Sequence, residues 1–572
     1  MRSEQQLGAG DGVPSFDLTR QPWLPVQLCD GSEVTLSLRE VFARAQGIRR
    51  LAGDISTQDF ALLRLLLAIA HDALDGPADL DAWAGLWQEE TPFARVPEYL
   101  DEHRERFDLL HPQAPFFQTA GLRTPNDEAF ALNRIIADVP NGDPFFTARF
   151  PSPERITFAE AARWAVHVHA YDTSGIKTGV VGDSRAKNGK AYPLGVAWTG
   201  NLDGVAVEGG TLRETLLLNL VAADSRQAPS SGEDRPAWRR SPTGPGVAAD
   251  LESGLGVRPS GVCDLYTWQS RRLRLVADEG AVYGVVLTYG DPLAQQNMHA
   301  AEPMAGWRRS SRQERKLSQA LVYMPREVDP ARAAWRGLAA LIVPREEGAA
   351  ARGGAAPSLR PRIVEWLARL SNGRVLPRGT MVQVRTCGAV YGTQQSVIDE
   401  IVEDTVAMAV HLLSEADRHL GQAAVDAVAD AEAAVCTLSD LAADLARAAG
   451  SESDSGKDTA RDTGFGVLDG LFRIWLGAIH EGDEPQELRT DWQRTVRREI
   501  SRLGDDLIAT AGEAAWLGRV LTQPKGPVWL NTASADVWFH SRLKRSLPRA
   551  YEPGPASAAW PAAGPAPVEV TF

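Results

Sequence analysis

The stretch Gly388-Ala389-Val390-Tyr391-Gly392-Thr393-Gln394-Gln395-Ser396 decides how this chain is organised, because the residue pattern differs on its two sides. Residues 380–386 have the alternation of a strand, and residues 397–420 carry apolar side chains at helical spacing. Two glycines permit a sharp turn, and the final serine is typical of a helix N-terminus. We therefore predict a hinge loop from which Gln394 and Gln395 project, although an ordinary domain connector has the same local pattern.

The chain beyond this stretch has the periodicity of helices. Apolar side chains recur every three or four residues in four runs, at 397–420, 423–449, 465–480 and 485–507, and a further run at 533–546 can join them. Four helices with short connections predict a bundle. The preceding chain mixes short strands with helices. We predict an α+β fold, with a large mixed α/β N-terminal domain over residues 1–390 and a C-terminal four-helix bundle with a loop and a tail over residues 391–572.

Length and composition restrict the class of protein. A chain of 572 residues with 44% hydrophobic residues is expected to form two or more globular domains. It contains no apolar run of about 18 residues and no basic-then-apolar leader, so no membrane contact and a cytoplasmic location are expected. The four cysteines are far apart, which predicts reduced thiols without a metal knuckle or a disulfide framework.

The net charge of -14 argues against a protein that binds nucleic acid alone, since such binding depends on clustered positive charge. Local basic clusters nevertheless exist. They lie at 238–240, 307–316, 494–498 and 542–545, and two of them contain a tryptophan. Each cluster is either a phosphate-binding patch or an ordinary solvated surface.

No motif for catalysis or for a cofactor is present. The chain lacks the GxxxxGK[ST], GxGxxG and GxSxG patterns of phosphate loops, dinucleotide sites and nucleophile elbows. His167 and His169 are two residues apart on an expected helix, where they point in different directions, so packed histidines are favoured over a metal site. His411 and His419, with carboxylates nearby, keep a helical-bundle metalloenzyme open as an alternative, although the ExxH pair of such bundles is missing.

Several blocks in order along the chain resemble one known family. The blocks are Trp23-Leu24-Pro25-Val26, the loop from His111-Pro112 to Phe117-Gln118-Thr119, the leucine-rich helix from Leu212 to Leu220, and Tyr391 to Ser396 followed by Ile398 and Glu400. Together they resemble CasA, the large subunit of the type I-E CRISPR surveillance complex Cascade.

The resemblance implies a non-catalytic protein that reads a protospacer-adjacent motif (PAM) on duplex DNA and starts to unwind the duplex beside it. It implies that Gln395, with Gln394 beside it, is the wedge that enters the duplex, and that a glycine loop contributes Ser174, Gly175, Lys177 and Gly179 to the minor groove. It also implies that Phe145 or Phe146 contacts the 5′ handle of the CRISPR RNA (crRNA). The implied partners are the other Cascade subunits, the crRNA, double-stranded target DNA and the helicase-nuclease.

The chain departs from some relatives in one respect. Residues 270–290 lack the four-cysteine cluster that those relatives carry, so no zinc and no other cofactor are expected. The second alternative that the sequence leaves open is a protein-docking scaffold. The observation that suggests it is the acidic net charge.

Overall fold

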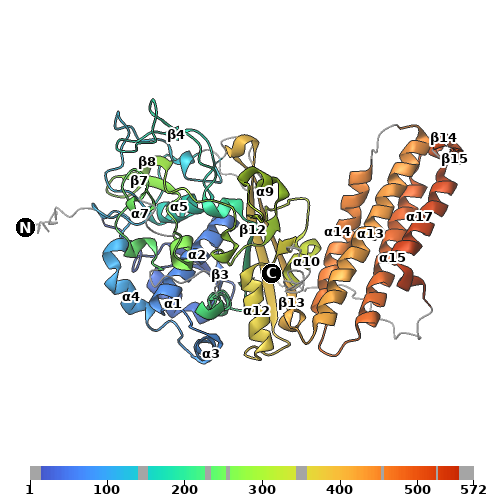
Figure 1. The fold of residues 1–572 in the computed structure, drawn as a ribbon, viewed down its shortest axis with the longest axis horizontal. Coiled ribbons are helices and arrows are strands. Elements are labelled where there is room, and N and C mark those ends of the chain that lie inside the picture. The colour runs from blue at the N-terminus through green and yellow to red at the C-terminus, as the bar shows by residue number, and fades with distance from the viewer. Residues whose placement is uncertain are drawn as a thin grey trace, which may run out of the picture. The chain divides into compact units, whose positions relative to one another are not determined.

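The computed structural model describes residues 15–139, 152–225, 234–252, 258–342, 357–451, 456–523 and 526–552. The chain forms two compact units (Figure 1). Unit 1 consists of Met1–Gln422 with Leu476–Glu481, and unit 2 consists of Ala423–Trp475 with Gly482–Phe572. The division near residue 422 differs from the expected one between residues 390 and 391, which falls inside unit 1.

Unit 1 begins with an antiparallel sheet and a pair of packed helices. The sheet has the strand order β2-β1-β3, with β1 Leu24–Leu28, β2 Glu33–Leu36 and β3 Ile48–Leu51. Helices α2 (Ser56–Ala73) and α5 (Phe158–Tyr171) pack against each other. A hydrogen bond of 3.0 Å between Thr57 Oγ1 and His167 Nε2 joins them. Because α2 is buried on nearly all sides, it forms part of the core of unit 1.

The central sheet of unit 1 contains the organising stretch. Its order is β13-β12-β6, with β6 Gly204–Glu208, β12 Met381–Tyr391 and β13 Ile398–Ala409 (Figure 1). Strands β12 and β13 pair antiparallel along their whole length. The prediction of a helix at 397–420 is therefore wrong. Residues 398–406 contain five β-branched side chains, which pack well on a pleated surface, and pairing with β12 outweighs the helical spacing of the apolar residues.

Shorter elements complete unit 1. Three further sheets pair β4 (Lys177–Thr178) with β5 (Lys190–Ala191), β7 (Arg271–Ala277) with β8 (Val282–Tyr289), and β9 (Trp307–Arg309) with β10 (Tyr323–Pro325) and β11 (Ser358–Leu359). The helices are α1 Leu38–Ala43, α3 Leu80–Gln88, α4 Val96–Glu102, α6 Leu212–Leu218, α7 Ala249–Glu252, α8 Val262–Tyr266, α9 Ser311–Leu317, α10 Ala339–Ile342 and α12 Arg362–Asn372.

Unit 2 is a helical bundle. Its long helices are α13 Arg418–Ala449, α14 Lys457–Gly477, α15 Pro485–Ala509 and α17 Thr532–Ser546, with α16 Glu513–Leu517 and the hairpin β14 (Arg519–Gln523) and β15 (Gly526–Leu530) between the last two. The rings of Phe472 and Trp475 lie 5.3 and 5.5 Å from the ring of Trp492 in its core. The predicted α+β fold with a C-terminal bundle is thus confirmed. The fourth helix is α17, and the predicted first helix at 397–420 is not part of the bundle.

Unit 1 contains a buried ion pair in its core. Both guanidinium nitrogens of Arg64 donate to Glu302, at 3.0 and 2.8 Å, and Trp198 Nε1 donates to the same carboxylate at 2.8 Å. The three groups satisfy one another, as buried charges require. Among the described residues, no helix combines the length and the apolar composition that crossing a bilayer requires.

Candidate nucleic-acid interface

The tip of the β12–β13 hairpin presents both predicted glutamines to solvent. Gly392 N donates to Val397 O at 3.1 Å and closes the tip. Gln394 and Gln395 have φ values of 57° and 55°, in the left-handed region that is unfavourable for residues other than glycine. Their side chains are exposed. The two amides therefore project from a constrained hairpin, whereas the sequence had suggested a hinge before a helix.

Tyr391 fixes the end of β12 to the rest of unit 1. Its hydroxyl group donates to the carbonyl of Tyr171, the last residue of α5, at 2.7 Å. A Cβ added to Gly200 would lie 2.2 Å from the same hydroxyl, so only glycine leaves room for the ring. Burial raises the pKa of Tyr391 well above its usual value, which keeps the hydroxyl protonated as a donor. The tip thus begins from a rigid base.

The predicted glycine loop lies directly against this tip. Ser174 N donates to Gln395 O at 2.7 Å. Tyr289 OH donates to Gly175 O at 2.6 Å and accepts from Gly175 N at 3.0 Å. A Cβ added to Gly179 would lie 2.9 Å from the facing backbone. The structure therefore brings together two segments that are more than 200 residues apart in the sequence and holds the loop by its backbone.

Lys177 has a different position from the one expected. The pleat of β4 turns its side chain inward, where Nζ lies 2.6 Å from Asp172 Oδ2, and the side chain is only 10% exposed. Arg271 Nε also donates to Asp172 Oδ2, and Arg271 Nη2 donates to three backbone carbonyls at 3.0 to 3.1 Å. Burial lowers the pKa of Lys177, and the attraction of Asp172 opposes this effect. The ammonium group thus fixes the base of the loop and does not reach the solvent.

Phe145 and Phe146, the residues expected to contact the crRNA handle, lie outside the described residues. Their role stays a prediction.

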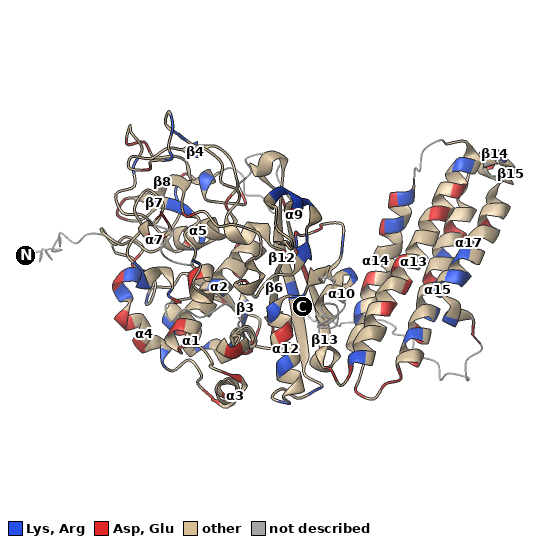
Figure 2. Ribbon diagram, in the orientation of Figure 1, with Lys and Arg blue, Asp and Glu red and all other residues tan. Residues whose placement is uncertain are grey.

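One of the basic clusters found in the sequence is open to solvent. Helix α9 carries Arg312, Arg315 and Lys316, all exposed, and its ribbon is largely blue, the colour of Lys and Arg, in Figure 2. No carboxylate of the described residues forms an ion pair with these three cations. Strand β6 runs away from the tip, and its first residue, Gly204, forms an antiparallel bridge with Ala305. The chain after Ala305 therefore runs toward the tip, and it leads through β9 into α9. The cluster therefore lies at the same end of the sheet as Gln395.

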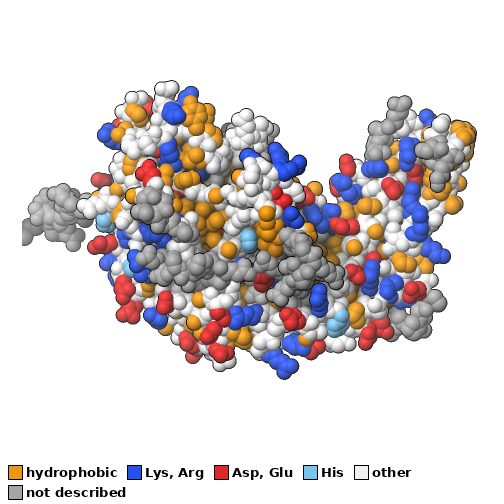
Figure 3. All heavy atoms as spheres, viewed as in Figure 1, with side chains coloured by type: hydrophobic (Ala, Val, Ile, Leu, Met, Phe, Trp, Pro, Cys, Tyr) orange, Lys and Arg blue, Asp and Glu red, His pale blue; other side chains and the backbone are white. Residues whose placement is uncertain are grey.

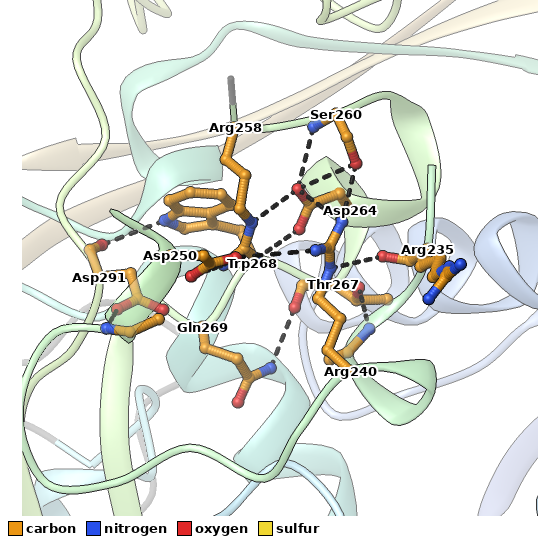
Figure 4. Close-up of polar contacts among 12 residues, drawn as sticks. Arg235, Arg240, Asp250, Arg258, Ser260, Asp264, Thr267, Trp268, Gln269 and Asp291 are labelled. Atoms are coloured by element: carbon orange, nitrogen blue, oxygen red, sulfur yellow. Dashed lines mark hydrogen bonds and ion pairs between the residues drawn. The ribbon is translucent and has the colours of Figure 1, made fainter. Parts of the chain in front are cut away.

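The basic cluster at 238–240 binds its own chain (Figure 4). Arg240 Nη2 donates to Ser260 Oγ at 2.7 Å and lies 3.1 Å from Asp264 Oδ2. Arg258 donates to both oxygens of Asp264, at 2.6 and 3.0 Å, and its guanidinium carbon lies 4.8 Å from the centre of the Trp268 ring. These contacts join Arg240 and Arg258 to α8, which contains Asp264, and to the residues beside it. The cluster is structural and leaves little charge for phosphates.

The histidines that motivated a metal site are separated. His411 is buried, with its Nδ1 3.2 Å from Arg378 O, whereas His419 is exposed in the first turn of α13. Glu403 pairs with Arg385 at 2.7 Å. His167 and His169 are buried, and burial lowers the pKa of each, to about 3 and about 4. Among the described residues, no three His, Cys, Asp or Glu side chains gather as metal ligands would.

Sequence reasoning missed the side chains that hold the loop. Asp172, Arg271 and Tyr289 come from three different elements, and no spacing along the chain connects them. One signal was present. Arg271 and Arg272 stand together at the start of β7, and both are buried, with each guanidinium group bound to a carboxylate.

The comparisons with known proteins agree on one family. A family model described as CRISPR-associated protein Cse1 matches residues 17–503. The crystal structure of Cse1 from Thermobifida fusca is 56% identical, with a TM-score of 0.86 over 94% of this chain and 99% of that chain. A chain of a solved CRISPR RNA-guided surveillance complex is 17% identical, with a TM-score of 0.61 over 87% of this chain and 99% of that one, and shares the fold.

A curated CasA/Cse1 protein from Thermus thermophilus is 29% identical over 306 residues, which cover 50% of this chain and 56% of that protein. The match thus spans little more than half the length of that relative. The family model covers most of the chain, and the residues that it matches include both the hairpin tip and the glycine loop. This chain belongs to the Cse1 family of CRISPR-associated proteins.

Proposed function

We propose that this protein is the non-catalytic large subunit of a type I-E CRISPR RNA-guided surveillance complex, acting in antiviral defence. Its family and its likeness to a chain of such a complex support the assignment. Its partners are the other subunits of the complex, the crRNA, double-stranded target DNA and the helicase-nuclease that it helps to recruit. Phe145 and Phe146 keep the role that the resemblance implies, contact with the crRNA 5′ handle.

The hairpin tip and the glycine loop together read the PAM and open the duplex beside it. The observation that carries this proposal is the hydrogen bond from Ser174 N to Gln395 O, which joins a backbone loop to two exposed amides. A backbone loop that approaches the minor groove reads its degenerate pattern, so several PAM sequences are accepted. The glutamine amides then enter the base stack at a cost of a few kcal/mol, and pairing with the guide offsets that cost.

The solvent-facing cations of α9 bind phosphates of the same duplex. Arg312, Arg315 and Lys316 lie at the tip end of the central sheet and have no internal carboxylate partner among the described residues. Phosphate contacts position a protein on DNA without reading sequence. In this proposal α9 orients the duplex, while the tip and the loop supply the selectivity.

R-loop formation by the assembled complex tests the proposed function. Gln395→Ala removes one amide from an exposed position, so assembly is expected to be unchanged while R-loop formation on a target with a PAM slows at least tenfold. The control is Gln46→Ala, which removes an exposed amide elsewhere in unit 1. Equal rates for the two variants would contradict the wedge role. A scaffold that only docks proteins would give complexes whose DNA binding does not depend on the PAM.

A further inference from the structure

The outer face of the β4–β5 ribbon carries side chains that the proposed function does not use. The antiparallel register sets Lys177 opposite Ala191, and both point inward. Because side chains alternate along a strand, Lys190 points to the opposite, outward face, and Ile176 and Tyr192, which directly flank the inward-facing Lys177 and Ala191, are exposed as well. Ile176 is 60% exposed and Tyr192 is 52% exposed. Figure 3 shows hydrophobic and basic side chains at the end of unit 1 where Figure 1 labels β4.

A tight turn adds a second lysine to this face. Lys187 and Lys190 exchange two backbone hydrogen bonds, of 2.9 and 3.0 Å, around Asn188 and Gly189. Both central residues have positive φ, 50° and 71°, as the type I′ turn favoured by Asn-Gly requires. Directly opposite residues point to the same face, so the turn holds two ammonium groups side by side.

No interaction with a carboxylate of the described residues accounts for the position of the two paired lysines. Like charges directly opposite each other destabilise a pair of strands. Lys187 and Lys190 are exposed, and no carboxylate among the described residues forms an ion pair with either of them. By contrast, the neighbouring Lys177 is neutralised by Asp172. A multiply charged anion outside the protein would remove the repulsion between the two outward ammonium groups.

The outer face is close enough to the hairpin tip to meet the same duplex. The backbone N–H of Ser174 donates a hydrogen bond to Gln395 O, and Thr178, four residues later, pairs with Lys190 across the ribbon. Four extended residues and one strand spacing together span less than about 20 Å. A duplex that receives the glutamine amides therefore passes within reach of the ribbon.

We propose that Ile176, Lys187, Lys190 and Tyr192 form a further DNA-contact surface, here called the ribbon surface, which binds the backbone of the duplex beside the hairpin tip. The two ammonium groups bind phosphates on adjacent nucleotides. Ile176 and Tyr192 pack against the deoxyribose rings that line the minor groove, where proteins often place apolar side chains. The inference rests on the proposed function for the choice of duplex DNA as the ligand.

The salt dependence of binding tests the two lysines. The experiment measures the affinity of the assembled complex for a PAM-containing duplex at several salt concentrations. Each phosphate contact contributes about 0.9 to the slope of log K against log salt, so Lys187→Gln with Lys190→Gln is expected to reduce the slope by about 1.8. The control, Arg44→Gln with Arg95→Gln, removes two exposed cations next to α1 and α4, on the far side of unit 1 from β4 in Figure 1, and should keep the wild-type slope.

The apolar pair has a different signature in the same experiment. Ile176→Ser with Tyr192→Ser removes apolar contact without removing charge, so affinity should fall by roughly tenfold at every salt concentration while the slope stays unchanged. Met381→Ser is the control, because Met381 is 49% exposed at the other end of the hairpin.

The outcomes separate this inference from the proposed function. A wild-type slope in the double lysine variant overturns the inference, even if Gln395→Ala slows R-loop formation as proposed. A complex that binds duplexes with and without a PAM equally well contradicts the proposed function. The slope of log K against log salt, measured on any duplex, still tests the ribbon surface in that case. Unchanged DNA binding with loss of a subunit from the complex would mean that the ribbon surface binds protein, which also overturns the inference.

Discussion

Tyr289 stabilises the glycine loop through one hydroxyl group that serves both backbone groups of Gly175. The guanidinium carbon of Arg271 lies 4.8 Å from the centre of its ring, and the tyrosine is only 1% exposed. Tyr289→Phe would leave the amide and the carbonyl of Gly175 without this partner. We expect the free energy of unfolding of unit 1 to fall by about 1–3 kcal/mol, measured in urea, and discrimination between PAM and non-PAM duplexes to weaken.

A matched control for this substitution lies in the same strand. Tyr283 is 45% exposed in β8, so Tyr283→Phe removes a hydroxyl group from an exposed side chain and should change stability little. If both variants lose the same stability, the hydroxyl of Tyr289 does not hold the loop.

Gln395 allows the roles of its backbone and its side chain to be measured separately. Its φ of 55° favours glycine, so Gln395→Gly should be more stable than Gln395→Ala by about 1 kcal/mol. Both variants lack the amide, and we expect R-loop formation to slow to the same extent in both. Thermal unfolding and R-loop kinetics provide the two readouts. Faster R-loop formation by the glycine variant would mean that backbone strain, and not the amide, limits unwinding.

At the scale of elements, the sequence predicted most of the bundle and the position of the tip but not the hairpin. Runs at 423–449, 465–480 and 485–507 correspond to α13, α14 and α15 because each run has one apolar face. The run at 397–420 failed because a strand with both apolar and acidic residues on each face can imitate helical spacing. Its β-branched residues were the better signal, and its pairing partner was what decided the structure.

The geometry of the candidate site was predictable only where a single segment determines it. The projection of Gln394 and Gln395 from a loop was predicted because glycines flank them, and the structure has both side chains exposed at the tip. The inward position of Lys177 could not be found, since it depends on Asp172, Arg271 and the pleat of a two-residue strand. Contacts between distant segments leave no periodicity in a single sequence.

The hairpin depends on the contact between Tyr391 and Gly200. A Cβ at position 200 would lie 2.2 Å from the Tyr391 hydroxyl, so Gly200→Ala should lower the free energy of unfolding by about 1–3 kcal/mol. Tyr391→Phe removes the clashing oxygen, and the double variant should lose less stability than the sum of the two single variants. Gly47→Ala is the control, because nothing lies within 4 Å of a Cβ added there. Strict additivity in the double variant would contradict the contact.

At the scale of the whole molecule, the extent of unit 1 predicts where the chain can be divided. A chain that ends at residue 390 lacks β13 and therefore leaves the long edge of β12 unpaired. Such an edge promotes aggregation. We expect this chain to aggregate on expression, whereas a chain ending at residue 422 keeps the hairpin and should contain more monomer in size-exclusion chromatography. Equal monomer yields would show that β13 is dispensable.

The stability of unit 1 should also depend on pH. Burial lowers the pKa of His167 to about 3 and that of His169 to about 4, below the ordinary value of 6.5. Between pH 6.5 and about 4 the unfolded chain binds more protons than the folded one, so the free energy of unfolding falls as the pH falls. Burial raises the pKa of Asp59 and of Asp203 to about 6. Between pH 4 and about 6 the folded chain therefore binds more protons at these two carboxyls than the unfolded chain does. Their contribution to the free energy of unfolding falls as the pH rises, which opposes the effect of the histidines.

The contribution of one histidine can be isolated by difference. The ring of His169 bonds to Phe117 O through Nε2 at 2.9 Å and accepts from Arg271 N through Nδ1 at 3.3 Å, so the neutral form fits both partners. His169→Gln removes the titrating group. At pH 7 the variant should be less stable than the wild type, and that difference should shrink by on the order of 3 kcal/mol when urea unfolding is repeated near pH 4. A difference between His169→Gln and the wild type that stays constant with pH would show that His169 is not held neutral in the folded protein.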